Sequence, residues 1–150
     1  MASTLETLKN ASIVSIGSGV KRPVEMAENN SAAINQMIGK IFTTRNLVHF
    51  AHWATNSFAA HEALGDLYED IVKQVDEIVE VYQGKHGLLT GLSCPAADMP
   101  LDIFNHIVNE QGWICENKRN IANGCEAVEN LIDELDAAYL KIIYKLKNLK

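Results

Sequence analysis

The feature that most constrains the fold is an apolar stripe with helical spacing between residues 58 and 83. Apolar side chains recur there every three or four positions, with charged residues between them. The stripe consists of Leu64, Leu67, Tyr68, Ile71, Val75, Ile78, Val79 and Tyr82. This period belongs to an amphipathic α-helix and not to a strand, whose side chains alternate every two residues. Such a helix needs neighbours that cover its stripe.

Three other segments carry the same period. We predict helices over 31–54, from Pro100 to about Asn117, and from Asn120 or Asn123 towards the C-terminus. Nine Gly and three Pro are too few turn residues for an all-β sandwich of this length. The sequence therefore predicts an all-α fold, because four amphipathic helices in one domain pack as a four-helix bundle.

The first 30 residues differ from the rest of the chain. They show no sustained period and are interrupted by Gly17, Gly19 and Pro23. We therefore expect two regions, an N-terminal arm over 1–30 and a four-helix bundle over 31–150.

The charge balance argues against a nucleic-acid-binding surface. Thirteen Lys and Arg oppose nineteen Asp and Glu, for a net charge of −6. In the arm, Lys9, Lys21 and Arg22 are balanced by three acidic residues, and the lysines near the C-terminus match the dipole of the last helix. We therefore expect no strong nucleic-acid binding.

Hydropathy and cysteine content indicate the compartment. No apolar run approaches the roughly 18 residues of a membrane span, and the first residues, MASTLETLKN, lack the basic start and apolar block of a secretory signal. Three cysteines without a CxxC pair suit free thiols in a reducing compartment, and we expect them as small core residues. These features predict a cytoplasmic protein that does not contact a membrane.

Residues that could bind a metal concentrate in one part of the chain. His49, His52 and His61 fall within 13 residues, beside a segment that carries Lys73 as its one basic residue between 57 and 84. The acidic residues of that segment are Glu62, Asp66, Glu69, Asp70, Asp76, Glu77 and Glu80. Imidazole and carboxylate together suit iron, manganese or zinc.

Helical geometry decides how these ligands could meet. His52 and His61 flank one short turn between antiparallel helices, so both can reach one point near the end of the bundle. Asp76 follows His61 by 15 residues, about 22 Å along a helix, so it cannot join them within one chain. A second copy docked across a two-fold axis would bring its Asp76 and Glu80 to the two histidines. The sequence therefore predicts a metal site between subunits, with Glu62 as a bridging carboxylate.

Residues 49–84 resemble the ferritin-like Dps family. The family pattern has a His-Trp pair at the end of the first helix, matched by His52 and Trp53, a second histidine matched by His61, and Asp-Glu-Ile-x-Glu, matched at 76–80. The resemblance covers about a quarter of the chain. It implies a ferritin-like four-helix bundle, a homo-oligomer with two-fold contacts, and an intersubunit iron site that oxidises and stores iron.

One departure from the Dps pattern limits the implied activity. A further family carboxylate, one turn after the second histidine, falls at Gly65. We therefore expect slower iron oxidation than in a complete site, or none.

The motif HxxHWxTxSxxxH is also similar to that of small Dps-like proteins encoded by tailed bacteriophages. This likeness implies an alternative function, a non-catalytic structural or interaction protein such as a phage virion or head-associated component. Residues 1–30 would then bind a virion partner, and the protein would be found in the bacterial host cytoplasm or in the virion.

Two plainer interpretations stay open at the level of the sequence. His52 and Trp53 could be packing residues at a helix end, and the acidic stripe could be a solvated helix face. No phosphate-binding loop, serine-hydrolase elbow or HExxH motif occurs, so those reaction classes have no support.

Overall fold

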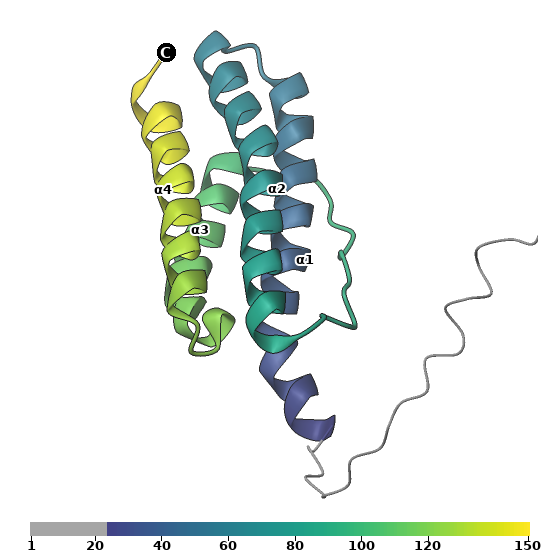
Figure 1. Ribbon diagram of the computed structural model, residues 1–150. Helices are drawn as coiled ribbons and strands as arrows, with labels where there is room; N and C mark the ends of the chain where they lie inside the picture. The colour runs from purple at the N-terminus through teal and green to yellow at the C-terminus, as the bar shows by residue number, and fades with distance from the viewer. Residues whose placement is uncertain (1–23) are drawn as a thin grey trace, which may run out of the picture.

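The computed structural model describes residues 24–150, with side chains from residue 31 onwards (Figure 1). Four helices and no strand occur in this described part, which confirms the all-α four-helix bundle. The helices are α1 Val24–Ala54, α2 Phe58–His86, α3 Ile103–Ala122 and α4 Glu126–Asn148. The predicted arm lies outside the described residues up to residue 23, and its remaining part, 24–30, belongs to α1.

Two predicted helix starts were wrong, and capping explains both. The third helix begins at Ile103 and not at Pro100, because the Asp102 side chain accepts a hydrogen bond from the backbone N–H of Asn105 (3.2 Å). Asn123 does not open the fourth helix. It ends α3 with a φ of 48°, a left-handed conformation that Asn tolerates better than most residues.

The connections set the direction in which each helix of the bundle runs. α1 and α2 form an antiparallel hairpin, and α3 and α4 form another, whereas residues 87–102 run back along the outside of α1 so that α2 and α3 are parallel (Figure 1). Each helix packs against two neighbours, α1 and α4 both contacting α2 and α3. A single long crossover is the connectivity used by ferritin-like bundles.

The crossover is held to α1 by polar contacts. Asn35 Nδ2 donates to the carbonyl of Thr90 (2.8 Å), and Thr43 Oγ1 donates to the carbonyl of Pro95 (2.9 Å). Gly39 allows this close approach, since a Cβ there would stand 2.6 Å from the carbonyl oxygen of Ser93. The linker therefore lies against one helix face although it contains no helix itself.

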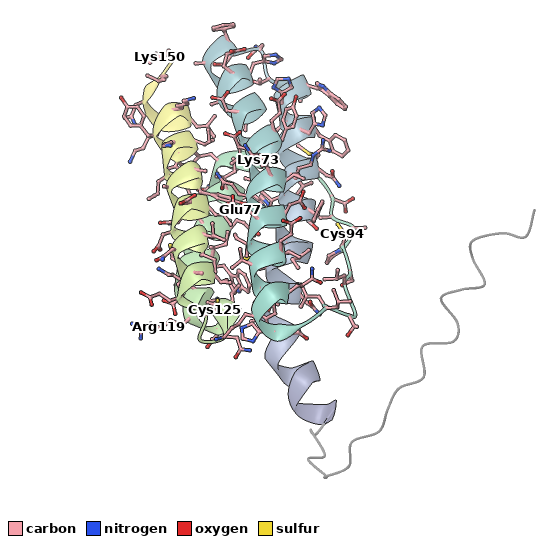
Figure 2. The ribbon with its side chains drawn as sticks, viewed as in Figure 1. Lys73, Glu77, Cys94, Arg119, Cys125 and Lys150 are labelled. Carbon is pink, nitrogen blue, oxygen red and sulfur yellow. The ribbon has the colours of Figure 1, made fainter. Side chains whose placement is uncertain are left out.

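The core follows the predicted stripes. Most of the α2 stripe is buried, together with inward residues of the other helices, among them Ile34, Ile41, Ile114 and Tyr139. The expectation that all three cysteines are core residues was wrong. Cys125, at the α3–α4 turn, is buried, whereas Cys94 in the crossover is an exposed free thiol (Figure 2). Cys115 in α3 is also an exposed free thiol. None of the helices in residues 24–150 is long and apolar enough for a membrane span.

Candidate metal centre

The α1–α2 turn places the two predicted histidine ligands against each other. α1 ends at Ala54, and Ser57 caps α2 by accepting a hydrogen bond from the backbone N–H of Ala60 (3.3 Å). This tight turn makes the end of α1 and the start of α2 antiparallel neighbours. The imidazole rings of His52 and His61 stack with their centroids 3.7 Å apart and their planes 26° apart.

Reciprocal hydrogen bonds fix both rings. His52 Nδ1 lies 2.8 Å from the backbone carbonyl oxygen of His61, and His61 Nδ1 lies 3.0 Å from that of His52. A carbonyl oxygen only accepts hydrogen bonds, so each Nδ1 carries the proton and donates. In the neutral ring the lone pair is then on Nε2. An Nδ1–H bonded to a backbone carbonyl is the usual support of a histidine that binds a metal through Nε2.

The stacking restricts how these two ligands can act. An imidazole binds a metal in the plane of its ring, at about 2.0–2.1 Å from the nitrogen. Two rings stacked at 3.7 Å cannot both direct in-plane lone pairs at one ion at that distance. The residues therefore fit a metal in their chemistry and tautomer, but this arrangement lets each ring bind its own ion unless one ring rotates.

Aromatic side chains surround the histidine pair. His49 stacks on Tyr68 at 4.0 Å between centroids, and Trp53 lies 4.3 Å from His49. The edge of Tyr68 meets His52 at 5.3 Å. Burial and then the charge of Arg45 lower the pKa of His49, so the cluster favours neutral imidazole at that position.

Gly65 explains the departure from the Dps pattern. It lies in α2, one turn after His61, and a Cβ there would stand 3.4 Å from both Cε1 and Nδ1 of His52. A longer side chain pointing the same way would occupy the space of the imidazole ring. The space that a carboxylate side chain would need at this position, where the Dps resemblance leads us to expect one, is therefore filled by the His52 ring.

The predicted carboxylate ligands are not assembled with the histidines in one chain. Glu62, Asp76 and Glu80 are all exposed on α2. Among the described residues no group of three or more His, Cys, Asp and Glu side chains is close enough to hold a metal ion. A complete site of the predicted composition thus requires ligands from a second chain, and the intersubunit site stays a prediction.

The comparisons with known proteins give a family but no activity. The model of a family of unknown function, DUF5856, matches residues 52–146, well over half of the chain. The chain belongs to the DUF5856 family. Neither the curated proteins nor the solved structures contain a match. The DUF5856 match begins at His52 and includes His61, Asp76 and Glu80, so all proposed ligands lie within the part of the chain that the family shares.

A second polar cluster, which the sequence interpretation missed, lies inside the bundle. Glu110 is 3% exposed and its Oε2 accepts a hydrogen bond from Lys40 Nζ at 2.9 Å. Its Oε1 and the hydroxyl of the fully buried Tyr139 have no hydrogen-bond partner. Nearby, His106 Nε2 lies 2.8 Å from Thr44 Oγ1, and burial lowers the pKa of His106.

A sequence signal for this cluster did exist. Glu110 lies three residues after Ile107 and four before Ile114, on the apolar face of α3. A charged residue within an apolar stripe indicates a buried ion pair, because an unpaired buried charge is too costly.

Proposed function

We propose that this DUF5856 protein is a Dps-like member of the ferritin-like superfamily that binds iron between its subunits. The observation that carries the proposal is the reciprocal hydrogen bonding of His52 and His61, which places the lone pair of each neutral ring on Nε2. The single crossover between α2 and α3 supports it as well, because ferritin-like bundles share that connectivity.

Each proposed ligand has a distinct role. His52 and His61 supply imidazole nitrogens whose orientation is fixed by the backbone. Asp76 and Glu80 of the partner subunit supply carboxylates that neutralise a divalent cation, and Glu62 bridges. Iron is the cargo of this site, and zinc or manganese would be bound by the same ligands. Because Gly65 removes one carboxylate, we propose binding with slow oxidation, or none.

Paired substitutions on α2 test the ligand set. We expect His61→Ala with Glu80→Ala to abolish binding of Fe²⁺ under anaerobic conditions and of Zn²⁺ in calorimetry, since even indirect supports of a metal site matter about 10–100-fold. His86→Ala with Glu77→Ala is the matched control, because it removes one exposed imidazole and one exposed carboxylate from the same helix. Equal loss in both variants, or in neither, would show that these residues are not the site.

Subunit mixing tests whether the ligands come from two chains. Chains with His61→Ala and chains with Glu80→Ala should each bind poorly. In a mixed two-fold dimer, one of the two sites combines both defects and the other is intact. Random exchange of subunits should therefore restore roughly a quarter of the parental sites. No recovery after verified exchange would place both residues in the same chain's site or in no site.

The second candidate is a non-catalytic structural or interaction protein, for example a phage virion or head-associated component. The observation in its favour is a group of exposed aromatic side chains, Phe50, Trp53 and Phe58, at the tip of the α1–α2 hairpin. Exposed apolar groups that gather in one place mark interaction sites. Elemental analysis of the purified oligomer, combined with its mass, separates the two, since this alternative requires no bound metal.

A further inference from the structure

The outward face of α4 has a charge pattern that complements itself. Seven exposed residues recur at alternating spacings of four and three along this helix: Glu126, Asn130, Asp133, Ala137, Leu140, Tyr144 and Lys147. This spacing is that of a coiled-coil seam. The seam is acidic in its first half, has a small residue near its middle, and is apolar and basic in its second half.

The second half of the seam is more apolar than a solvated helix face needs to be. Leu140 is 49% exposed and Tyr144 is 59% exposed, and both point away from the core that their neighbours Tyr139 and Ile142 enter. Apolar side chains at a seam position, with no neighbour covering them, indicate a surface that another helix can cover.

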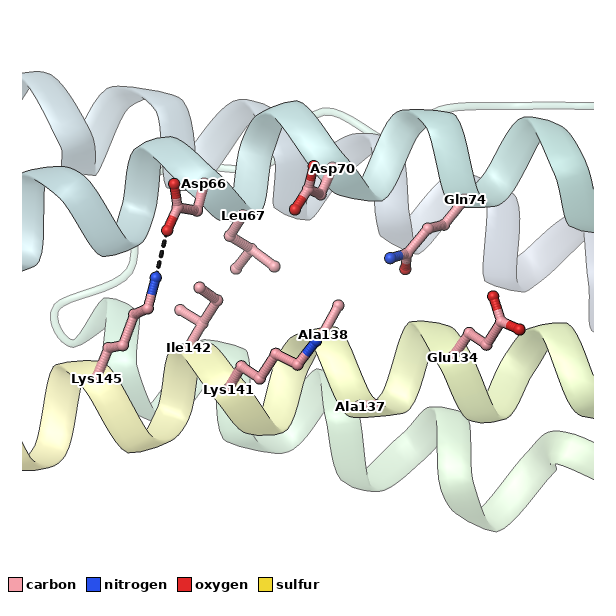
Figure 3. Close-up of a pocket in the computed structure, with 10 residues that line it drawn as sticks. All are labelled: Asp66, Leu67, Asp70, Gln74, Glu134, Ala137, Ala138, Lys141, Ile142 and Lys145. Atoms are coloured by element: carbon pink, nitrogen blue, oxygen red, sulfur yellow. Dashed lines mark hydrogen bonds and ion pairs between the residues drawn. The ribbon is translucent and has the colours of Figure 1, made fainter.

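A hollow lies beside the middle of the seam. Between α2 and α4 a groove of about 310 Å³ opens where Ala137 and Ala138 leave space, with Glu134 and Lys141 on either side of them (Figure 3). Gln74 of α2 also lines this groove, and its buried Oε1 has no hydrogen-bond partner. The groove offers room for a side chain from outside, next to a polar atom that lacks a contact.

The charges beside the groove are available to a partner. Within residues 31–150, Lys145 pairs with Asp66 and Lys118 pairs with Asp133, but neither Glu134 nor Lys141 forms an ion pair. Glu134 and Lys141 are seven residues apart on one helix, about 10 Å, which is too far for a direct contact.

We propose that α4 pairs with α4 of a second copy of this chain, antiparallel and about a two-fold axis. In the register that places Leu140 of each copy against Ala137 of the other, Lys141 falls within one turn of the partner's Glu134. Tyr144 then faces the partner's Asp133. The contact is isologous, so each favourable pair occurs twice. The occupant is a second copy because one helix carries both halves of the complementary pattern.

This interface is separate from the proposed metal site. It uses α4 and the groove edge towards α2, whereas the metal site uses the histidine pair and the carboxylates Asp76 and Glu80. Failure of either proposal leaves the other standing.

A charge exchange tests the pairing. Sedimentation equilibrium should show self-association for the parent, and about tenfold weaker association for Lys141→Glu or Glu134→Lys, because each change places two like-charge pairs in the interface. The double variant should recover the parental association, since the two exchanged charges meet across the axis. Lys147→Glu combined with Glu77→Lys is the control. It also exchanges one basic and one acidic residue, but on residues that do not meet across the axis, so Glu77→Lys should not restore any association that Lys147→Glu removes. A monomeric parent, or a double variant no better than the single ones, would overturn the proposal.

Cross-linking tests the register independently of any other interface. In a Cys94→Ser, Cys115→Ser background, chains with Ala137→Cys and chains with Leu140→Cys should form a mixed disulfide on mild oxidation, because disulfides need Cα atoms within about 7 Å. Ala127→Cys with Leu140→Cys should not cross-link, as these positions lie about 15 Å apart in this register. Equal cross-linking of the two pairs would contradict it.

Discussion

Removing the charge of Lys40 tests the buried ion pair between α1 and α3. Glu110 is 3% exposed, and Lys40 Nζ is the partner of its Oε2, while its Oε1 has none. Lys40→Met keeps most of the aliphatic length and removes the ammonium. It leaves a carboxylate inside the bundle without a compensating cation, which is the costly way to break a buried ion pair.

The magnitude follows from how deeply each partner is buried. Breaking a buried pair from one side costs about 3–5 kcal/mol. The Lys40 side chain is 33% exposed, so water reaches the vacated position and the lower end applies. Lys40 Nζ also lies 5.0 Å from the centroid of the Trp113 ring, a cation–π contact of about 0.5–1 kcal/mol. We expect a loss of about 3–4 kcal/mol in the free energy of unfolding. A loss of about 3 kcal/mol lowers the Tm of a chain of this size by roughly 6–12 °C.

Denaturant unfolding at pH 7 measures this loss, with Lys118→Met as the matched control. Lys118 pairs with Asp133 at 2.5 Å, but the Asp133 side chain is 60% exposed, so the control should lose at most about 1 kcal/mol. The double variant Lys40→Met with Glu110→Leu should regain most of the stability, because an apolar pair of similar volume replaces the ion pair. If Lys40→Met costs no more than Lys118→Met, Glu110 is not desolvated and the reasoning fails.

Four other substitutions have defined outcomes. Gly39→Ala should detach the crossover from α1 and expose it to limited proteolysis, whereas Gly112→Ala, with nothing within 4 Å of the new Cβ, should stabilise the helix by about 1 kcal/mol. Burial holds the pKa of His106 in the folded protein below 6.5. The contribution of His106 to stability is therefore complete above pH 6.5 and is lost as the pH falls towards that lowered pKa. His106→Gln should remove this part of the pH dependence of the free energy of unfolding. Although the Cys115 side chain is exposed, partial desolvation by its neighbours, and then the hydrogen bond and charge of Asp136, raise the pKa of its thiol to about 11. Alkylation at pH 8 should therefore be slow and Asp136→Asn should speed it, as mass spectrometry would show.

The sequence predicts the helices well because burial of a stripe determines them. The stripe from Leu64 to Tyr82 alternates with charges so regularly that no competing structure could bury it, and the structure confirms it. Helix ends are harder, because single side-chain contacts decide them. Asn123 is equally suited to open a helix and to end one in the left-handed conformation, and nothing local in the sequence separates the two.

The candidate site also combines features that the sequence predicts with features that single side-chain contacts decide. That His52 and His61 meet follows from their positions on either side of a short turn. The stacking of the two rings, and the hydrogen bond of each ring to the other's backbone, depend on χ angles and on the space at Gly65. Helical spacing in the sequence specifies neither. Glu110 could have been found as an interruption of an apolar stripe, but its partner Lys40 is 70 residues away and only packing identifies it.

The stacked histidines also bear on how the proposed site would fill. Letting both Nε2 atoms reach one ion requires one ring to rotate, which breaks its Nδ1 hydrogen bond, about 0.5–1.5 kcal/mol, and the ring stacking, about 0.5–1.5 kcal/mol. Structural Zn²⁺ in zinc-finger peptides binds with about 10–16 kcal/mol; a site with even a fraction of that affinity outweighs the cost of breaking the stack. The stack makes two outcomes distinguishable. If the rings stay stacked, each Nε2 binds separately and two ions enter per chain, whereas rotation gives one ion per chain and changes the signals of the imidazole protons.

Because Gly65 lies against the Nδ1–Cε1 edge of His52, Gly65→Ala should hinder movement of that ring more than of His61. Metal stoichiometry in the parent and in Gly65→Ala therefore identifies which histidine moves.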